Sequence, residues 1–444
     1  MTTNRQLRSL PTEMISPPRK YFGTDGIRGS VGEWPVTPDC MLHLGHAAGR
    51  VLGKGQEHPL VLIGKDTRVS GYMFESALEA GLVSAGADVR LLGPLPTPAV
   101  SWLTRSMPAS AGIVISASHN PYTDNGVKFF GPDGEKLADP VERDLETMLE
   151  QPLQTVASCD LGKVSHLDDA VHRYAEFCLS TVSEGFSLHG RRLVLDCAHG
   201  ATYQVAPQVF AELGAEVQLI GTEPNGFNIN AGVGSTHPQA LSDAVRAAHA
   251  ELGIAFDGDG DRVMMVDHRG RVVDGDDLLY ILVRNHLRHG RLRGPVIGTV
   301  MSNHALDLAL RKLGVEFLRA PVGDRHVRRA LREHGGLLGG ETSGHLLCLD
   351  RSPAGDGVIA ALAVLEALQS LDCALDSPHV LLHKLPQRMI NVPVSYQAEA
   401  VLAAQSVIDM RDEIERTLGD SGRVVLRASG TEPLVRVTIE GGDA

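Results

Sequence analysis

The sequence predicts an α/β protein in which three similar α/β domains precede a smaller α+β domain. Its 444 residues are too many for one hydrophobic core, and this length suggests about three domains. A pattern of strand, glycine-bearing or polar turn, helix, turn and strand occurs in residues 60–92, 192–221 and 295–319. Each such unit places two parallel strands in one sheet, joined by a right-handed crossover.

The end of the chain follows a different pattern. It contains a short strand that starts at Pro393, helical periodicity from Ala398 to Leu418, and strand-like runs over residues 423–427 and 434–439. This mixture is typical of a small α+β domain. We therefore expect four domains, over residues 1–160, 161–263, 264–378 and 379–444.

In the first domain, residues 112–130 read GIVISASHNPYTDNGVKFF. The apolar run 113–115 predicts a buried strand that ends in a turn carrying Ser118 and His119, with Lys128 ten residues further on. Ligands of α/β sheets bind at the carboxyl ends of the strands. A serine hydroxyl near an imidazole and an ammonium group therefore predicts a functional loop, although the stretch alone also fits an ordinary polar loop.

In the second domain, the strand 252–256 is followed by three alternating carboxylates, Asp257, Asp259 and Asp261. Oxygen ligands on a tight glycine turn suit Mg²⁺. A calcium-binding loop also starts D-x-D-x-D, but here Arg262 stands where that loop needs glycine and His268 where it needs glutamate. A solvated acidic turn is the remaining alternative.

Three further loops carry polar groups suited to a sugar phosphate. Glu341 and Ser343 in GGETSGH can hydrogen-bond sugar hydroxyls, and the turn around Gly323 offers Arg325. The glycine-rich segment YFGTDGIRG offers Arg28. Between the last two strands, RASGTEP can wrap a phosphate with Arg427, Ser429, Gly430 and Thr431. Ordinary loops and a hairpin turn are the alternatives for these segments.

Composition argues against two classes of partner. The net charge of −13, from 41 basic and 54 acidic residues, disfavours a nucleic-acid-binding surface, which needs a basic face. No apolar run reaches the length of about 18 residues that a membrane span needs. The six cysteines form no C-x-x-C pair and predict a reduced, cytoplasmic protein. Residues 1–18 have no apolar signal segment and predict a disordered leader, in which Met14 can be an alternative start.

Five segments together resemble the α-D-phosphohexomutase superfamily, in the family's own order: YFGTDGIRG, ISASHNPYTDNGVKFF, FDGDGDR, GGETSGH and RASGTEPLVRV. The resemblance runs from about Arg19 to the C-terminus. The first and fourth segments favour the branch that acts on glucosamine phosphates. Two positions depart from the family pattern: Ala428 stands where lysine is frequent, and His199 where asparagine is common.

This resemblance implies mixed sheets in four domains around a central cleft, each domain contributing one loop. It implies interconversion of glucosamine 6-phosphate and glucosamine 1-phosphate for UDP-N-acetylglucosamine synthesis. The route runs through phosphorylated Ser118 and a 1,6-bisphosphate intermediate, with glucosamine 1,6-bisphosphate or glucose 1,6-bisphosphate as activator. The expected partners are small-molecule sugar phosphates, and the expected assembly is a monomer or homodimer.

The resemblance also implies a role for each site residue. Mg²⁺ is expected on Ser118, Asp257, Asp259 and Asp261, and Lys128, His119 and Arg28 are expected to be catalytic, with Lys128 the better acid or base. The expected substrate-binding residues are Arg262, Gly323, Asp324, Arg325, Glu341, Ser343 and His345. The expected phosphate-binding residues are Arg427, Ser429, Gly430, Thr431 and Arg436. A phosphoglucomutase or phosphomannomutase, and a catalytically inactive sugar-phosphate sensor, remain as alternative functions.

Overall fold

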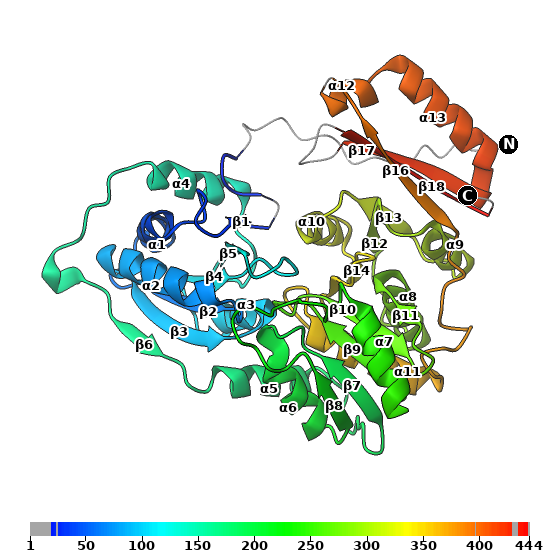
Figure 1. The fold of residues 1–444 in the computed structure, drawn as a ribbon, viewed down its shortest axis with the longest axis horizontal. Coiled ribbons are helices and arrows are strands. Elements are labelled where there is room, and N and C mark those ends of the chain that lie inside the picture. The colour runs from blue at the N-terminus through cyan, green and yellow to red at the C-terminus, as the bar shows by residue number, and fades with distance from the viewer. Residues whose placement is uncertain (1–18, 24, 396, 429–433, 443–444) are drawn as a thin grey trace.

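The computed structural model describes residues 19–23, 25–395, 397–428 and 434–442. The predicted leader at residues 1–18 therefore lies outside the described residues. The described chain forms four sheets in sequence order, each with its own helices (Figure 1). The predicted fold class is confirmed: three α/β units with mixed sheets precede a small C-terminal unit.

The first sheet has the order β1-β5-β4-β2-β3-β6. Strands β4, β2, β3 and β6 are parallel, whereas β1 and β5 are antiparallel additions at one edge. The central strand β4 is apolar along its whole length, and β2 is apolar up to Lys65, because helices cover both faces of the sheet. The elements are β1 (Ile27–Ser30), α1 (Pro38–Leu52), β2 (Leu60–Lys65), α2 (Val69–Ser84), β3 (Asp88–Pro94), α3 (Thr97–Ser106), β4 (Ala111–Ile115), β5 (Asp124–Phe130), α4 (Asp139–Leu149) and β6 (Val164–His166).

Helices α1 and α2 pack unusually closely on one face of this sheet. A side chain at Gly81 would meet the Leu42 carbonyl oxygen at 2.1 Å, and one at Gly45 would meet the Leu78 carbonyl oxygen at 2.4 Å. Two glycines therefore permit the approach. The inward face of α2 carries Phe74, Leu78, Gly81 and Leu82, which are buried.

The second sheet has the order β11-β10-β9-β7-β8. Strands β7, β8 and β9 are parallel, and β10 and β11 complete the sheet as antiparallel neighbours. Helix α7 covers one face, where Leu241 and Val245 pack on the sheet, and α5 and α6 cover the other. The elements are α5 (Ala170–Ser180), β7 (Arg192–Asp196), α6 (Val205–Glu212), β8 (Glu216–Ile220), α7 (Pro238–Ala248), β9 (Leu252–Phe256), β10 (Val263–Asp267) and β11 (Val272–Val273).

The third sheet has the order β13-β12-β14-β15, and only β15 is antiparallel. Helix α11 is apolar on nearly all sides, and it is buried from Gly357 to Leu368. Asp274 is the N-cap of helix α8, and its carboxylate accepts hydrogen bonds from two backbone N–H groups of the first turn. The elements are α8 (Gly275–Arg288), β12 (Val296–Thr299), α9 (His304–Lys312), β13 (Phe317–Ala320), α10 (Asp324–His334), β14 (Leu338–Gly340), β15 (Leu346–Cys348) and α11 (Gly357–Leu371).

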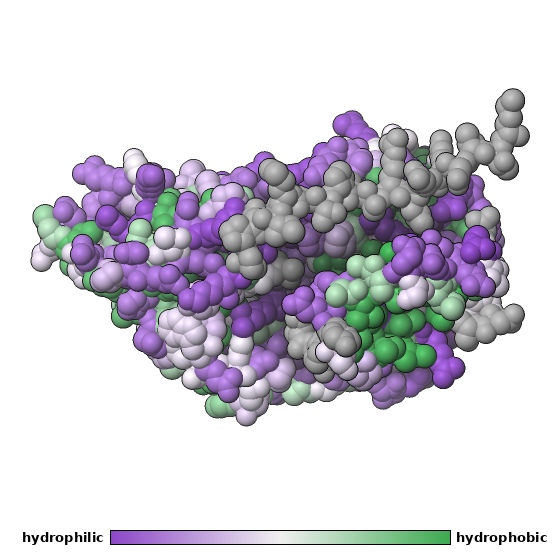
Figure 2. All heavy atoms as spheres, turned by 90° about the horizontal axis from the view of Figure 1, so that it is seen from above, coloured by the Kyte–Doolittle hydropathy of each residue, from purple (hydrophilic) through white to green (hydrophobic). Residues whose placement is uncertain are grey.

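The C-terminal unit is a three-stranded antiparallel sheet of order β16-β18-β17 with two helices. Its first strand is exposed along its whole length, including Met389, Ile390 and Val392. Viewed from above, the side of the molecule where this unit lies carries a gathering of hydrophobic side chains (Figure 2). The elements are β16 (Gln387–Pro393), α12 (Ala398–Leu402), α13 (Gln405–Leu418), β17 (Gly422–Ala428) and β18 (Leu434–Gly441). The strand predicted to start at Pro393 ends there instead.

One hydrophobic cluster runs through the first three units. It includes Leu62 of β2, Leu193 of β7 and Leu278 of α8, so these sheets share a core. Among the described residues, the hydrophobic clusters end at Leu382, and the C-terminal unit is joined mainly by polar contacts. Examples are the hydrogen bond from the His304 amide to Glu440, 2.8 Å, and from Arg423 to the Ser302 carbonyl, 2.6 Å. Within the described part of the chain, no helix is both long and apolar enough to cross a membrane.

Candidate active site

Ser118 lies in the loop between β4 and β5, at the carboxyl end of a central strand, as predicted. Its φ of +52° places it in the left-handed region, which is uncommon for a residue with a side chain. The serine is 1% exposed, and its amide donates a hydrogen bond to the Ser116 hydroxyl at 2.9 Å. The loop is thus held in a conformation that local preference alone does not favour.

Two side chains from different units hold this loop through its carbonyl oxygens. Arg68, at the start of α2, donates to the Ser118 carbonyl at 3.2 Å and to the Asn120 carbonyl at 2.6 Å. Asn230 of the second unit donates to the same two carbonyls, at 2.9 and 3.0 Å. Arg68 is fully buried and forms an ion pair with Asp66. The loop is therefore clamped between the first and second units.

The three aspartates predicted to bind metal follow β9 and converge. Asp257, Asp259 and Asp261 are buried, and one ligand oxygen from each lies within 4.8 Å of the others. Gly260, with φ +74°, allows the tight turn that alternates them. The Ser118 hydroxyl donates to Asp257 Oδ2 at 2.6 Å, so the predicted serine and the predicted triad meet.

A divalent cation fits this cluster. One oxygen each of Asp259 and Asp261 is buried without a hydrogen-bond partner among the described residues. Carboxylate oxygens are the ligands that Mg²⁺ prefers. Burial, and then repulsion from Asp261 and Asp259, raises the pKa of Asp257 well above its usual range. A cation among the three would remove that repulsion.

Lys128 lies directly beside the triad. It stands on β5, and its ammonium contacts Asp259 at 2.7 Å, Asp25 at 3.0 Å and Asp261 at 3.5 Å. Burial lowers the pKa of Lys128, but the three carboxylates outweigh burial and raise it, so the group is a cation here. The predicted proximity of Lys128 to the aspartates is present, together with a carboxylate, Asp25, that sequence reasoning did not single out.

The other two predicted catalytic residues lie at the same place. Arg28, on β1, forms an ion pair with Asp25. The His119 ring lies 3.4 Å from the Ser118 hydroxyl through Nδ1. Burial, and then the nearby Arg262 and Arg28, lowers the pKa of His119 to about 4, so the imidazole is neutral at pH 7.

The third unit brings its predicted loop to the triad through His345. His345 Nδ1 lies 3.6 Å from Asp261, and Nε2 lies 3.6 Å from Asp324. Burial lowers the pKa of His345, but these two carboxylates raise it to about 9. Glu341 accepts a hydrogen bond from the Gly323 amide at 2.8 Å, which ties the two predicted sugar loops together. Ser343 donates to the other Glu341 oxygen at 3.5 Å.

The two predicted substrate-binding arginines differ in placement. The Arg262 backbone N–H donates to Asp257 at 3.2 Å, and its guanidinium lies 3.8 Å from Asp261, so it borders the triad. Arg325 instead reaches the first unit, with contacts to Asp139 at 2.6 Å and to Glu142. Its role toward substrate stays a prediction.

The predicted phosphate loop is described only at its ends. Arg427 and Arg436 face each other across β17 and β18, and the Nε atom of each is buried without a partner in the described part of the chain. Burial, and then Arg436, lowers the pKa of Arg427. Ser429, Gly430 and Thr431 lie outside the described residues.

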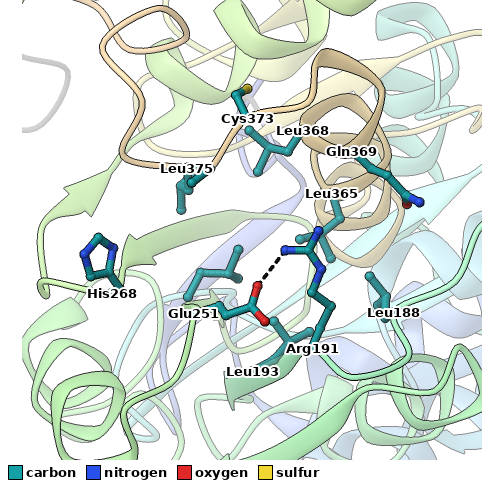
Figure 3. A pocket seen from close by; sticks show the side chains of 12 residues that line it. Leu188, Arg191, Leu193, Glu251, His268, Leu365, Leu368, Gln369, Cys373 and Leu375 are labelled. Atoms are coloured by element: carbon teal, nitrogen blue, oxygen red, sulfur yellow. Dashed lines mark hydrogen bonds and ion pairs between the residues drawn. The ribbon is translucent and has the colours of Figure 1, made fainter.

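The molecule also contains two cavities whose lining does not include the triad. A pocket of about 190 Å³ between the second and third units is lined mainly by apolar side chains, six of them leucines, with an Arg191–Glu251 ion pair of 2.6 Å at its edge (Figure 3). Its apolar lining does not suit a sugar phosphate. A cavity of about 890 Å³ lies between residues 130–141 and α10, beside Asp324 and Arg325.

Comparison with known proteins assigns the class. The family described as phosphoglucomutase/phosphomannomutase matches the chain four times: α/β/α domain I at residues 19–155, domain II at 172–270, domain III at 274–389 and the C-terminal domain at 389–444. The chain therefore belongs to the phosphoglucomutase/phosphomannomutase family and is a phosphotransfer enzyme of the phosphohexomutase class.

Relatives narrow the comparison. A phosphoglucosamine mutase from Xylella fastidiosa (strain M12) is 57% identical over 425 residues, covering 96% of this chain and 95% of the relative. Another, from Xanthomonas axonopodis pv. citri (strain 306), is 58% identical over 432 residues, covering 96% and 95%. The crystal structure of a phosphoglucomutase/phosphomannomutase family protein from Burkholderia thailandensis matches with a TM-score of 0.79 and 26% identity, covering 94% of this chain and 93% of that one.

Proposed function

We propose that the protein interconverts glucosamine 6-phosphate and glucosamine 1-phosphate through phosphorylated Ser118 and a 1,6-bisphosphate intermediate. The observation that carries the proposal is the 2.6 Å hydrogen bond from the Ser118 hydroxyl to Asp257 within a buried aspartate triad. The choice of glucosamine rests on relatives with 57–58% identity that are named phosphoglucosamine mutase.

The reaction is two phosphoryl transfers through one site. The phosphoryl group on Ser118 passes to the O1 hydroxyl of glucosamine 6-phosphate, which leaves free serine and the 1,6-bisphosphate. The bisphosphate turns over, and its 6-phosphoryl group passes to Ser118, which releases glucosamine 1-phosphate. Glucosamine 1,6-bisphosphate or glucose 1,6-bisphosphate can charge an unphosphorylated enzyme by the second transfer.

Mg²⁺ is the metal we assign to Ser118, Asp257, Asp259 and Asp261. When bound, it supplies positive charge beside the transferring phosphoryl group, whose charge spreads over three oxygens in the transition state. The chain adds fixed charge of its own, because Lys128 and Arg28 converge on Asp25 next to the triad. Preorganised charge of this kind is usually a large part of phosphoryl-transfer catalysis.

The predicted acid or base role of Lys128 stays a prediction, because three carboxylates outweigh burial and raise the pKa of Lys128, and its ammonium keeps its proton in this structure. The ammonium donates a hydrogen bond to Asp259 at 2.7 Å, so it supplies fixed positive charge at the triad. His119 is neutral and 3.4 Å from the serine, where it can orient the hydroxyl. Arg262 completes the charged border of this region.

The remaining predicted residues are assigned roles in binding the substrate, according to the loop in which each lies. Glu341, Ser343 and His345, with Gly323, Asp324 and Arg325, are assigned to the sugar and its phosphate. Arg427 and Arg436, with Ser429, Gly430 and Thr431, are assigned to the phosphate that is not reacting. The pairing of Arg427 and Arg436 across two strands supports this, since two adjacent guanidinium groups attract a dianion. The domain boundaries after residues 160, 263 and 378, and a monomeric or homodimeric assembly, stay predictions.

A substrate panel tests the function. Purified protein charged with glucose 1,6-bisphosphate, with Mg²⁺ present, is assayed on glucosamine 6-phosphate, glucose 6-phosphate and mannose 6-phosphate. We expect the highest kcat/KM on glucosamine 6-phosphate. A preference for either other sugar would reassign the protein to the phosphoglucomutase or phosphomannomutase activity, and inactivity on all three would favour a sugar-phosphate sensor.

A further inference from the structure

Lys136 is a lysine outside the assigned machinery that links the first and third units. It follows the β5 strand, and its ammonium contacts Asp324 at 2.6 Å and also contacts Asp25. Asp25 belongs to the first unit, whereas Asp324 begins α10 of the third. All three side chains are about four-fifths buried, with 18%, 21% and 19% exposure. The contact is therefore a partly buried ion-pair bridge between units, and Lys136 and Asp324 also line the cavity of about 890 Å³.

This bridge closes a ring of alternating charges. On one side, Asp25 contacts Lys128 at 3.0 Å, and Lys128 contacts Asp261 at 3.5 Å. On the other, Asp324 lies 3.6 Å from His345, which lies 3.6 Å from Asp261. The ring thus joins one group of the proposed metal site to three cationic groups through two carboxylates. Lys136 is the member farthest along the ring from Asp261.

The charges around Lys136 favour the bridge. Burial lowers the pKa of Lys136, but Asp25 and Asp324 outweigh burial and raise it. Without its ammonium, two carboxylates would face each other across the boundary between the units. Asp25 would keep Arg28 and Lys128, whereas Asp324 would keep only His345 within ion-pair distance among the described residues. Like charges in a partly buried site repel, so Asp25 and Asp324 would move apart, while Arg325 would still bridge the two units through Asp139.

We infer that Lys136 is a positioning residue: by fixing Asp25 against Asp324, it sets the distance at which Lys128 and His345 meet the aspartate triad. Its effect on catalysis rests on the proposed function, but the bridge itself does not. The ring distances carry the inference, since each neighbour of Lys136 touches a group that touches Asp261. A small shift of the first unit against the third would change the distances of Lys128 and His345 from Asp261. Misplacement by about 1 Å is enough to slow an enzymatic step roughly a hundredfold.

Three variants separate positioning from general stability. Lys136→Met removes the charge and keeps the length, Lys136→Arg keeps the charge, and Lys65→Met is the control. Lys65 is also buried and paired, to Glu75 at 2.5 Å, but that pair lies wholly within the first unit. If Lys136→Met does not fold, Lys136→Gln takes its place in both measurements below.

Hydrogen exchange by mass spectrometry tests the bridge without substrate. In Lys136→Met, peptides that cover β1 and the first turn of α10 should exchange faster than in wild type, and in Lys65→Met they should not. Unchanged exchange at both places would overturn the bridge, whatever reaction the protein catalyses. This measurement tests the bridge even if the protein is inactive on all three sugar phosphates. A failure of the bridge can therefore be distinguished from a failure of the proposed function.

Steady-state kinetics on glucosamine 6-phosphate test the positioning. We expect Lys136→Met to lower kcat roughly ten- to a hundredfold, with KM changed by less than about threefold. Lys136→Arg should recover most of the loss, and Lys65→Met should keep wild-type kcat. Equal losses in Lys136→Met and Lys65→Met, no recovery with arginine, or a change confined to KM would each overturn the positioning role.

Discussion

The buried ion pair between Arg68 and Asp66 should be the most sensitive structural support of the Ser118 loop. Arg68→Met removes the guanidinium and leaves the Asp66 carboxylate fully buried, with the Ser116 hydroxyl as its remaining side-chain donor. Breaking a buried pair from one side typically costs about 3–5 kcal/mol. Because the first three units share a core, that cost falls on a large folding unit, and Tm should drop by about 4–7 °C.

The loss should also depend on pH. Burial raises the pKa of Asp66 even though Arg68 opposes it, so the folded protein binds this proton more tightly than the unfolded chain. Such a group destabilises the fold as the pH rises from its unfolded pKa toward its folded pKa. Without Arg68 the folded pKa rises further. The difference in Tm between Arg68→Met and wild type should therefore be larger at pH 8 than at pH 5.

Differential scanning calorimetry at the two pH values measures this, with Arg173→Met as the control. Arg173 pairs with Asp169 on the surface at 2.8 Å, with both side chains about half exposed. Losing such a pair costs at most about 1 kcal/mol. If Arg68→Met and Arg173→Met shift Tm equally, or if the Arg68 effect is the same at both pH values, the reasoning about the buried pair is wrong.

Three further predictions concern the chemistry. Ser118→Ala should abolish nearly all turnover while keeping the fold, and intact-mass measurement should show an adduct of about 80 Da on a fraction of wild type only; a fully active variant would exclude the covalent route. Asp257→Asn, Asp259→Asn and Asp261→Asn should each weaken Mg²⁺ binding in isothermal titration and lower kcat, and unchanged affinity in all three would place the metal elsewhere. Arg427→Ala should raise KM for both sugar phosphates roughly ten- to a hundredfold, the worth of a charge-assisted contact of about 1.5–3 kcal/mol. Added glucose 1,6-bisphosphate should partly rescue it, whereas a fall in kcat alone, without rescue, would contradict the holding role.

Local sequence was sufficient to predict the parts of the site in which a strand and the loop after it lie in one short stretch. The apolar runs before Ser118 and before Asp257 predicted two buried strands, and their carboxyl ends do meet. The buried residues of α2, which include Phe74, Leu78 and Leu82, recur at helical spacing. The structure explains why histidine can stand at position 199, where asparagine is common. The φ of His199, +48°, lies in the left-handed region, in which asparagine and histidine are both enriched.

The supports of the site escaped sequence reasoning because they act across the chain. Arg68 and Asn230 hold the Ser118 loop over 50 and 112 residues, respectively, and no spacing rule links such positions. Thr97, which donates to Asp259 at 2.6 Å, lies in a different unit from its acceptor. The sequence contained a weak indication that Arg68 is near the site. Arg68 comes shortly after the strand at the start of the 60–92 repeat, in the segment LVLIGKDTR. The prediction that a strand starts at Pro393 was wrong, because the strand spans Gln387–Pro393 and Pro393 ends it.

The shared core of the first three units has a consequence for how the chain tolerates change. The sequence pattern suggests three independent repeats. In the structure, however, Leu62, Leu193 and Leu278 belong to one hydrophobic cluster, so the three sheets share a core. Cutting between them would expose apolar surface on both fragments, so none of the three is an exchangeable module. The contact between the third unit and the C-terminal unit, which includes the hydrogen bond from His304 to Glu440, is different. If the two units are separated, water can replace the hydrogen bonds between them. Recombination between related enzymes should therefore succeed at the C-terminal junction and fail at the two earlier ones.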